Sequence, residues 1–307
     1  MTHQQCVYVL KIHDTGTFSE AARQLFIAQS GLSNSVKLLE EELKIKIFER
    51  TKNGAALTSE GAEFIRYAEQ VVAQSEFILD RYGSQSKKDR LHISTQHYDF
   101  IADVFCEFID KSQSGGYNVS LKEKMTHEVI YDVETAMSDV GVIAVKKRDF
   151  EIMMRYLQTR DLSFFELLKT PPHMFVKSSH PLSGKTSVHY GELQRYPYVS
   201  YDQGKYNNSS LFTEEMSDNV VSDKHIVISD RATLMNMLLK TDCYTVGTGI
   251  MPSDLNDGKI ISIPIVTDEE YSVGYVVKRN RVNTKMAEQF ISLLNSFSSR
   301  YISKKKP

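Results

Sequence analysis

The chain contains 307 residues, of which 41% are hydrophobic and 25% are charged, and its formal net charge is −2. This length allows two or three domains with hydrophobic cores of their own, and the small net charge excludes a bulk polycation. No apolar run approaches the roughly 18–20 residues of a membrane span. The N-terminal sequence has no basic-then-apolar signal peptide, so we expect the protein to remain in the cytoplasm, away from membranes.

Three cysteines, Cys6, Cys106 and Cys243, lie far apart in the sequence. No two of them have the spacing of a metal-ligand pair or of a redox-active dithiol. We therefore interpret them as buried thiols and expect no metal site. A disulfide redox switch is the alternative interpretation.

The beginning of the chain predicts two helices separated by a break. Residues 3–14 have the apolar spacing of a helix, and the Asp-Thr-Gly-Thr stretch after them interrupts it. The inward-facing residues of this helix are expected to be Cys6, Val9, Leu10 and His13. The second helix should begin near Ser19, because serine is a favourable N-cap residue, with Phe18 before it as a hydrophobic staple.

A third helix is predicted from about Gln29 to Leu43. Its apolar residues recur at steps of 4, 3 and 4, so they share one face. These residues are Leu32, Val36, Leu39 and Leu43. The opposite face carries Ser30, Asn34, Lys37 and Glu41.

The polar face of this third helix has the chemistry of a DNA-reading surface. Asn34 can hydrogen-bond a base edge, Lys37 a phosphate or a guanine, and Ser30 either kind of partner. A helix that is buried on one side and carries short polar residues near its N-terminus on the other is suited to the major groove.

Residues 49–57 predict a β-hairpin, because an Asn53-Gly54 turn signal separates two short extended pieces. Gly54 permits a turn with positive φ. A hairpin at this place has the shape of a wing, from which Arg50 and Lys52 would reach phosphates. A surface hairpin without a partner is the alternative.

A long helix should follow from Ser59 to about Ser84, with Thr58 as its N-cap and Glu60 in its first turn. Apolar and small residues recur in it at steps of 3 and 4, as in the a and d positions of a coiled coil. They are Ile65, Ala68, Val72, Ser75 and Leu79. This narrow stripe favours pairing with a second copy of the chain; a helix that packs on its own chain is the alternative.

Four motifs of this region keep the order and spacing of a known signature. They are F-S-x-A-A-x-x-L (18–25), Q-x-x-L-S-x-x-V-x-x-L-E-x-x-L (29–43), I-F-x-R (47–50) and L-T-x-x-G (57–61). Together they resemble the N-terminal signature of LysR-type transcriptional regulators. The resemblance implies an all-α winged helix-turn-helix with a long linker helix that builds an antiparallel dimer.

The resemblance also implies roles for individual residues. The residues expected to contact DNA are Ser19, Gln29, Ser30, Ser33, Asn34, Lys37, Arg50, Lys52, Asn53 and Thr58. Those expected at the dimer interface are Ile65, Ala68, Val72 and Leu79. The chain departs from the family pattern at Ala28 and Ser30, where a serine and a proline are usual, at Lys44, where a glycine is usual, and at Asn53, where a wing arginine is usual. These departures concern the target sequence and the affinity, not the fold.

The charge of the first 60 residues argues against a simple basic DNA-binding module. They contain seven basic and seven acidic residues, which gives a net charge of zero. Many DNA-binding modules are distinctly basic. DNA binding by this region would therefore depend on where its cations lie and on the use of more than one copy.

Residues 83–90 are polar and rich in Gly and Ser, which predicts a hinge. After them strands alternate with helices, which predicts an α/β fold with a largely parallel sheet. The expected elements are strands at 91–95, 118–123 and 140–145 and helices at 98–111 and 129–137. From Leu162 a second α/β unit is expected, with strands at 173–176, 196–200, 226–228, 244–246, 260–265 and 272–277 and helices at 212–216, 231–239 and 286–297.

The second half of the chain also resembles the effector domain of LysR-type regulators, in the segments 180–197 and 246–252. The resemblance implies a two-lobed α/β domain similar to type 2 periplasmic binding proteins. The expected domains are a winged helix-turn-helix at 1–58, a linker helix and hinge at 59–89, and a two-lobed domain at 90–307. Lobe 1 would take up about 90–160 and 267–307, and lobe 2 about 161–266.

A small effector is expected between the two lobes, because ligands of parallel α/β sheets bind at the carboxyl ends of strands and near helix N-termini. The residues predicted to line this site are Ser94, Thr95, Gln96, Thr126, His127, Tyr201, Asp202, Thr248 and Gly249. Donor-rich loops and the neighbouring Lys146–Arg148 run favour an anionic effector such as a carboxylate. For each residue a plain cap or turn role is the alternative, and a solvated loop is the alternative for the basic run.

Catalysis has little support in the sequence. It contains no Gly-x-Ser-x-Gly elbow, no Walker loop and no paired-cysteine metal site, and we expect no cofactor. We therefore predict a non-enzymatic, effector-controlled transcriptional regulator that binds a dyad in promoter DNA as a homodimer or homotetramer. The alternatives are a small-molecule-binding protein or enzyme that uses the two-lobed domain alone, and a helical dimerisation module without DNA contact.

Overall fold

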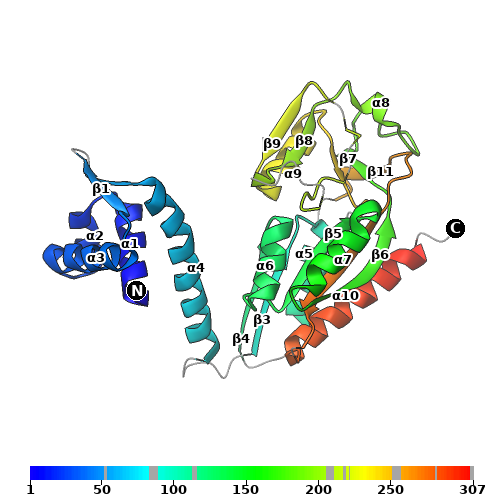
Figure 1. The fold of residues 1–307 in the computed structure, drawn as a ribbon. Helices are drawn as coiled ribbons and strands as arrows, with labels where there is room; N and C mark the ends of the chain where they lie inside the picture. The colour runs from blue at the N-terminus through cyan, green and yellow to red at the C-terminus, as the bar shows by residue number, and fades with distance from the viewer. Residues whose placement is uncertain are drawn as a thin grey trace. The chain divides into compact units, whose positions relative to one another are not determined.

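The computed structural model describes residues 1–51, 54–82, 89–112, 116–204, 211–216, 219–220, 222–250, 257–280 and 282–304. The chain forms two units, Met1–Lys87 and Lys88–Pro307. The first unit contains helices and one hairpin, and the second contains all of the larger sheets (Figure 1). The predicted linker helix lies within the first of these units.

The N-terminal unit begins with α1 (His3–Thr15), which starts at a capping box formed by Thr2 and Gln5. Its buried residues are Cys6, Val9 and Ile12. The prediction that His13 faces inward is wrong: Ile12 continues the buried face and His13 is exposed.

Helix α2 (Phe18–Gln24) begins earlier than predicted. Its N-cap is Thr17, whose side chain accepts a hydrogen bond from the backbone N–H of Glu20 at 3.2 Å. Ser19 therefore lies inside the helix and is not its cap. Phe18 opens the helix and packs edge-on against Phe48, with 5.7 Å between the ring centroids.

Helix α3 spans Gln29–Leu43, as predicted, and it buries Leu32, Val36 and Leu39. The sequence did not predict that Glu40 would be buried as well, with 8% of its surface exposed. Its carboxylate accepts hydrogen bonds from the backbone N–H groups of Ile47 at 2.8 Å and Phe48 at 3.2 Å, and from Lys46 Nζ at 2.8 Å. This carboxylate fixes the chain between α3 and the hairpin.

The predicted wing is an antiparallel hairpin of β1 (Phe48–Thr51) and β2 (Gly54–Leu57). Gly54 adopts the predicted positive φ, at 129°, and a Cβ there would lie 2.4 Å from the carbonyl oxygen of Gly16. The N–H of Ala55 donates to the same oxygen at 2.8 Å. The hairpin is thus tied to the turn between α1 and α2. Lys52 and Asn53, at its tip, lie outside the described residues.

Helix α4 spans Ser59–Tyr82, and Thr58 caps it as predicted, since Thr58 Oγ1 accepts from the N–H of Gly61 at 2.9 Å. Ile65 and Ala68 are 5% and 1% exposed within the core of the N-terminal unit. They pack on their own chain and are not available to a second copy, contrary to the predicted dimer seam. Val72 is partly buried against the same core, whereas Leu79 is 66% exposed.

Lobe 1 of the second unit is built on a five-stranded sheet in the order β4-β3-β5-β12-β6. Its strands are β3 (Asp89–Thr95), β4 (Tyr117–Glu123), β5 (Val140–Lys146), β6 (Leu162–Thr170) and β12 (Tyr271–Lys278). Strands β4, β3 and β5 are parallel, but β12 runs antiparallel to both of its neighbours. Four of the five strands therefore run in the same direction, as expected for a largely parallel sheet, and β12 is the exception. Lobe 2 starts after β6, later than the predicted residue 161.

Helices cover both faces of this sheet. They are α5 (Asp99–Lys111), α6 (Thr126–Glu134), α7 (Phe150–Gln158), which the sequence did not predict, and α10 (Lys285–Lys304), together with the 3₁₀ turn η1 (Lys147–Asp149). α5 and α10 share one hydrophobic cluster, in which Phe108 meets Phe290 edge-on at 5.8 Å. α6 and α7 bury Val129 and Met153 in another cluster.

Lobe 2 contains a three-stranded antiparallel sheet in the order β10-β7-β11 and a parallel pair, β8 and β9. Its elements are β7 (His173–Lys177), α8 (Tyr190–Leu193), β8 (Tyr198–Tyr201), β9 (His225–Ile228), α9 (Arg231–Lys240), β10 (Thr245–Gly247) and β11 (Ile260–Pro264). The helix predicted at 212–216 is wrong: this stretch is a turn followed by irregular chain.

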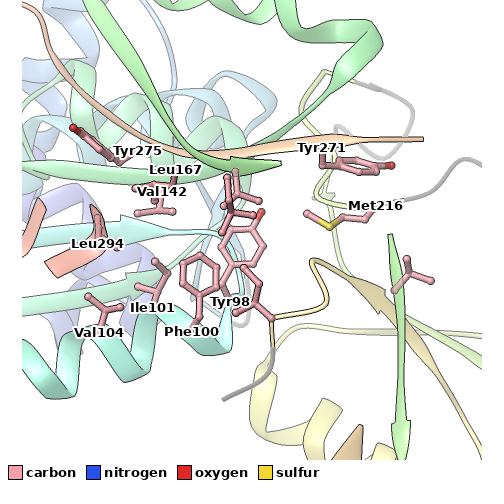
Figure 2. Close-up of a cluster of buried hydrophobic side chains, with 14 of the residues drawn as sticks. Tyr98, Phe100, Ile101, Val104, Val142, Leu167, Met216, Tyr271, Tyr275 and Leu294 are labelled. Atoms are coloured by element: carbon pink, nitrogen blue, oxygen red, sulfur yellow. The ribbon is translucent and has the colours of Figure 1, made fainter. Parts of the chain in front are cut away.

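A hydrophobic cluster continues from lobe 1 into lobe 2. Figure 2 shows Tyr98 beside Phe100 and Ile101 of α5, with Met216 and Tyr271 on its other side. Tyr98 stacks on Phe100 with 5.5 Å between the ring centroids. The irregular stretch that contains Met216 is therefore packed onto the core of lobe 1.

The prediction of three buried thiols is only partly right. Cys6 and Cys243 are buried, but Cys106 is exposed on α5. Its place on the solvent side of that helix explains why it contributes nothing to the core.

Candidate functional site

The exposed face of α3 presents the side chains that the sequence singled out for DNA contact. Gln29, Ser30, Asn34 and Lys37 are exposed, and Ser33 is half-buried. Lys37 Nζ lies 3.6 Å from Glu41 Oε1, with 68% and 57% of the two side chains exposed. Such an exposed pair contributes little to stability, so the lysine can exchange its partner for a phosphate.

Two further predicted residues serve the fold of the N-terminal unit. Ser19 Oγ donates to Gln29 Oε1 at 3.1 Å, which connects α2 to the start of α3. The hydroxyl of Thr58 caps α4 and donates to the carbonyl oxygen of Lys46. Arg50 lies on β1, but its side chain is outside the described residues.

The sequence analysis overlooked one residue between the two helices. Phe26 follows α2 with a φ of 56°, a backbone conformation that is uncommon for a bulky residue, and its side chain is 94% exposed. The sequence does contain a signal for this exposed position: Phe26 is a large aromatic residue that does not fit the apolar spacing of either neighbouring helix.

In the second unit, several predicted effector residues are buried and hydrogen-bonded within lobe 1. Ser94 Oγ donates to Asp132 Oδ2 at 2.6 Å and lies 2.7 Å from Ser138 Oγ. Gln96 donates from Nε2 to Thr126 Oγ1, and its Oε1 accepts from the N–H of Ala144 at 2.7 Å and from the hydroxyl of Tyr98. These side chains hold lobe 1 together, which is a structural role that the sequence alone did not distinguish.

The remaining predicted effector residues have mixed environments. Thr95 and Thr248 are buried, and the Oγ1 of Thr95 has no hydrogen-bond partner among the residues that the structure describes. His127 is half-buried and Asp202 is exposed. Gly249 has a φ of 75°, and a Cβ there would lie 2.4 Å from the ring of His173, so this position requires glycine.

A polar cluster joins the two lobes, and the sequence predicted only one of its members, Tyr201. We call it the interlobe cluster; it consists of His97, Asp99 and Glu123 from lobe 1 and Tyr201, Gln203, Glu214 and Arg231 from lobe 2. His97 Nδ1 lies 2.8 Å from Glu214 Oε1, and its ring stacks on Tyr201 with 3.9 Å between the centroids. Arg231 pairs with Asp99 at 3.1 Å and with Glu123 at 3.0 Å.

The charges of this cluster shift one another's pKa values. Burial opposes protonation of His97, but the hydrogen bond to Glu214 and the negative charges of Glu214 and Glu123 together outweigh it, and the pKa of His97 is raised. Burial also raises the pKa of Asp99 and of Glu123, and the guanidinium of Arg231 offsets part of that effect. The members from lobe 1 lie far in sequence from those of lobe 2, so no local motif could have indicated that they meet.

Neither a membrane span nor a metal site is found in the part of the chain that the structure describes. No helix there is long and apolar enough to cross a bilayer. No group of three or more His, Cys, Asp or Glu side chains is arranged to hold a metal ion within the same residues.

Two family models match the chain. Residues 3–62 match the bacterial regulatory helix-turn-helix protein model of the lysR family, and residues 114–298 match the LysR substrate binding domain. The chain belongs to the LysR family. As a LysR-family protein it is a DNA-binding transcriptional regulator, with a helix-turn-helix head and an effector-binding domain.

Individual relatives of this LysR-family chain are distant. It is 22% identical over 288 residues to the uncharacterized HTH-type transcriptional regulator YbhD of Escherichia coli, with 92% of this chain and 87% of that protein covered. It is 24% identical over 224 residues to the HTH-type transcriptional regulator SsuR of Burkholderia cenocepacia, with 70% and 69% covered. The crystal structure of CbnR, a LysR family transcriptional regulator, has the same fold, with a TM-score of 0.64 at 13% identity over 97% of this chain and 99% of that one.

Proposed function

We propose that α3 reads the major groove of a promoter dyad through Gln29, Ser30, Asn34 and Lys37, while the β1–β2 wing approaches the backbone. The observation that carries this proposal is the division of α3 into a buried apolar face and an exposed polar one. Docking by such a helix is how helix-turn-helix proteins read base edges. A structure of CbnR in complex with its target DNA, with a TM-score of 0.64 to this chain, supports the same use of the fold.

The protein acts as a homo-oligomer in this proposal, because one head has no net positive charge of its own. The distal part of α4 offers an apolar surface for pairing that differs from the predicted seam. Its exposed residues are Tyr67, Val71, Ile78 and Leu79. The first three recur at steps of 4 and 7 on one side of the helix, and Val72 borders them. Two or more heads on one DNA raise the affinity through effective concentration.

The effector of this proposal is a small anion that binds between the two lobes of the second unit. The donors of the interlobe cluster and the basic residues at the end of β5 support a negatively charged ligand. Effector binding shifts the relative placement of the heads by favouring one assembly state over another, which requires different affinities for the two states. The protein works in the cytoplasm, where promoter DNA is accessible.

The experiment that tests this function is selection of sheared genomic DNA on the purified full-length protein at two salt concentrations. We expect recovery of one or a few fragments with a dyad that survive the higher salt. Binding that depends on phosphates alone weakens steeply as salt rises. Recovery of random fragments that are lost at the higher salt would overturn sequence-specific recognition.

A further inference from the structure

The carboxylate of Glu214 sits in a set of donors that resembles a ligand-binding site. It accepts from His97 Nδ1 at 2.8 Å, from the backbone N–H of His97 at 3.3 Å, and from Gln203 Nε2 at 3.3 Å. The N–H of Glu214 in turn donates to Gln203 Oε1 at 3.0 Å. The side chains of His97 and Glu214 are only 9% and 6% exposed.

The donors and the acceptor come from different kinds of structure. His97 precedes α5 and Gln203 follows β8, so both lie at the ends of elements in the two lobes. Glu214 belongs to the stretch 211–216, which forms neither helix nor strand. Phe212 of this stretch packs edge-on against Tyr156 of α7, at 5.2 Å between ring centroids. The carboxylate is therefore presented to lobe 1 by an irregular segment of lobe 2.

The charge balance of the interlobe cluster favours a carboxylate in this position. When His97 is protonated, two cations face the three carboxylates of Asp99, Glu123 and Glu214. Exchange of Glu214 for the carboxylate of a ligand leaves this balance unchanged. A neutral ligand would leave the donors of His97 without a charged partner, and unpaired buried polar groups are costly.

Little space remains beside Glu214 for a ligand to bind in addition to it. A cavity of about 10 Å³ is lined by residues that include Lys146, Glu214, Met216 and Tyr271. This volume is about that of a single water molecule. Because the carboxylate of Glu214 already accepts from His97 and Gln203, a ligand carboxylate that took its place on these donors would have to displace the side chain of Glu214.

We propose that His97 and Gln203 form a carboxylate subsite of the effector cleft, that the chain's own Glu214 occupies it in the absence of effector, and that the effector displaces Glu214 with a carboxylate of its own. The inference rests on the proposed function, in that it places the effector between the lobes. Because the subsite is free only in the fraction of molecules in which Glu214 has left, the apparent affinity for the effector is reduced by that fraction.

Removal of the internal carboxylate tests the proposal. The Glu214→Ala variant of the full-length protein is compared with wild type in thermal unfolding at pH 7, with sodium acetate or propionate and with acetamide as the neutral analogue, at constant ionic strength. We expect acetate and propionate to raise the Tm of the variant and to bind it at least tenfold more tightly than they bind wild type. The Tm of wild type should stay almost unchanged with either anion, and acetamide should not change the Tm of either protein. Glu215→Ala, which removes the adjacent half-buried carboxylate, is the matched control and should respond as wild type does.

A second variant keeps the test decisive if the alanine variant folds poorly. Glu214→Gln retains the shape of the side chain, and the pKa of His97 can be followed by NMR. The groups that act on His97 are Glu214, Glu123, Arg231, Asp230 and Tyr201. Loss of the Glu214 charge alone should lower the pKa of His97 relative to wild type, and His97→Ala in the Glu214→Ala background should abolish the response to acetate.

The proposal is overturned if acetate and acetamide act alike on Glu214→Ala, or if the pKa of His97 is the same in wild type and in Glu214→Gln. Neither readout involves DNA. Failure of the DNA selection with a positive acetate response would refute the regulatory function and retain the subsite. The reverse result would refute the subsite and retain the regulator.

Discussion

The two units differ in how their polar side chains are used. In the N-terminal unit, the polar face of α3 that carries Asn34 and Lys37 is exposed to solvent. In the second unit, Gln96 and Thr126 are buried and hydrogen-bonded to each other. The polar side chains of α3 are therefore free to contact another molecule. Those of lobe 1 are instead hydrogen-bonded within the chain.

This difference has an energetic consequence. An exposed polar face costs nothing to keep open, so substitutions there should change binding and leave stability almost unaffected. Substitutions in a buried hydrogen-bond network should instead lower the free energy of unfolding, because loss of one side chain leaves its partners without a hydrogen bond. Four substitutions test this contrast, and the largest effects are expected in the buried network.

Gln96→Ala should be the most damaging change. It leaves the N–H of Ala144 and the hydroxyl of Tyr98 without their acceptor, at about 2 kcal/mol each and so about 4 kcal/mol in the unfolding free energy. Urea unfolding of the full-length protein measures the loss. Gln194→Ala, at an exposed position of lobe 2, is the control and should stay within about 0.5 kcal/mol. A stable Gln96→Ala protein that has lost only its effector response would reverse the interpretation.

Glu40→Ala tests a buried carboxylate of the N-terminal unit. We expect a loss of about 3 kcal/mol, since two backbone N–H groups lose their acceptor. Glu41→Ala, at the next residue of α3, which is exposed, is the matched control.

The stabilisation by Glu40 should also depend on pH. Burial opposes the charge of Glu40, but the hydrogen bonds from Lys46 and the backbone lower its pKa below the ordinary value of 4.5. The contribution of the Glu40 charge to the free energy of unfolding is therefore fully present above pH 4.5 and is lost as the pH falls through the lowered pKa. A difference in unfolding free energy between wild type and Glu40→Gln that grows in acid would contradict this.

Asn34→Ala should weaken binding to the selected DNA by about 1–3 kcal/mol, because an asparagine that reads a base loses its hydrogen bonds. The loss on random DNA should be much smaller, and the unfolding free energy should change little. Fluorescence anisotropy on both kinds of DNA separates the two effects. Equal losses on both would make Asn34 a residue that positions the head without reading sequence.

Lys37→Ala should have the smallest effect. If Lys37 meets a phosphate, the variant binds all sequences more weakly, and the slope of log K against log salt falls by about one unit. The measurement is a salt titration of DNA affinity. Lys169→Ala, an exposed lysine of the second unit, should leave the slope unchanged. A Lys37→Ala protein with the wild-type slope would remove this residue from the interface.

The sequence predicted the N-terminal unit well because local rules determine it. The spacing of Leu32, Val36 and Leu39 defines the buried face of α3, and the Asn53-Gly54 signal defines the hairpin. The errors there came from competition between similar caps, as with Thr17 and Ser19. Burial of Glu40 was missed because its partners lie beyond the end of its own helix.

The second unit was predicted in outline only. Strand patterns identified most of its elements, but no pattern indicates that β12 returns antiparallel to β5 and β6. The interlobe cluster was missed because its members are held together by the tertiary fold: His97 and Glu214 are 117 residues apart. Counting strands named residues such as Ser94, whose hydroxyl is hydrogen-bonded to Asp132 and Ser138 within lobe 1.

The position of β12 in the sheet of lobe 1 also determines when each unit can be completed during synthesis. The N-terminal unit has all of its elements once residue 82 has left the ribosome, whereas lobe 1 needs β12, which ends at Lys278, between β5 and β6. Domains fold as units, starting from the N-terminus. A nascent chain therefore carries a finished DNA-reading head while its ligand-responsive half is still an open sheet with unpaired strand edges. A polypeptide that ends early would contain the helix-turn-helix head without the domain that responds to an effector.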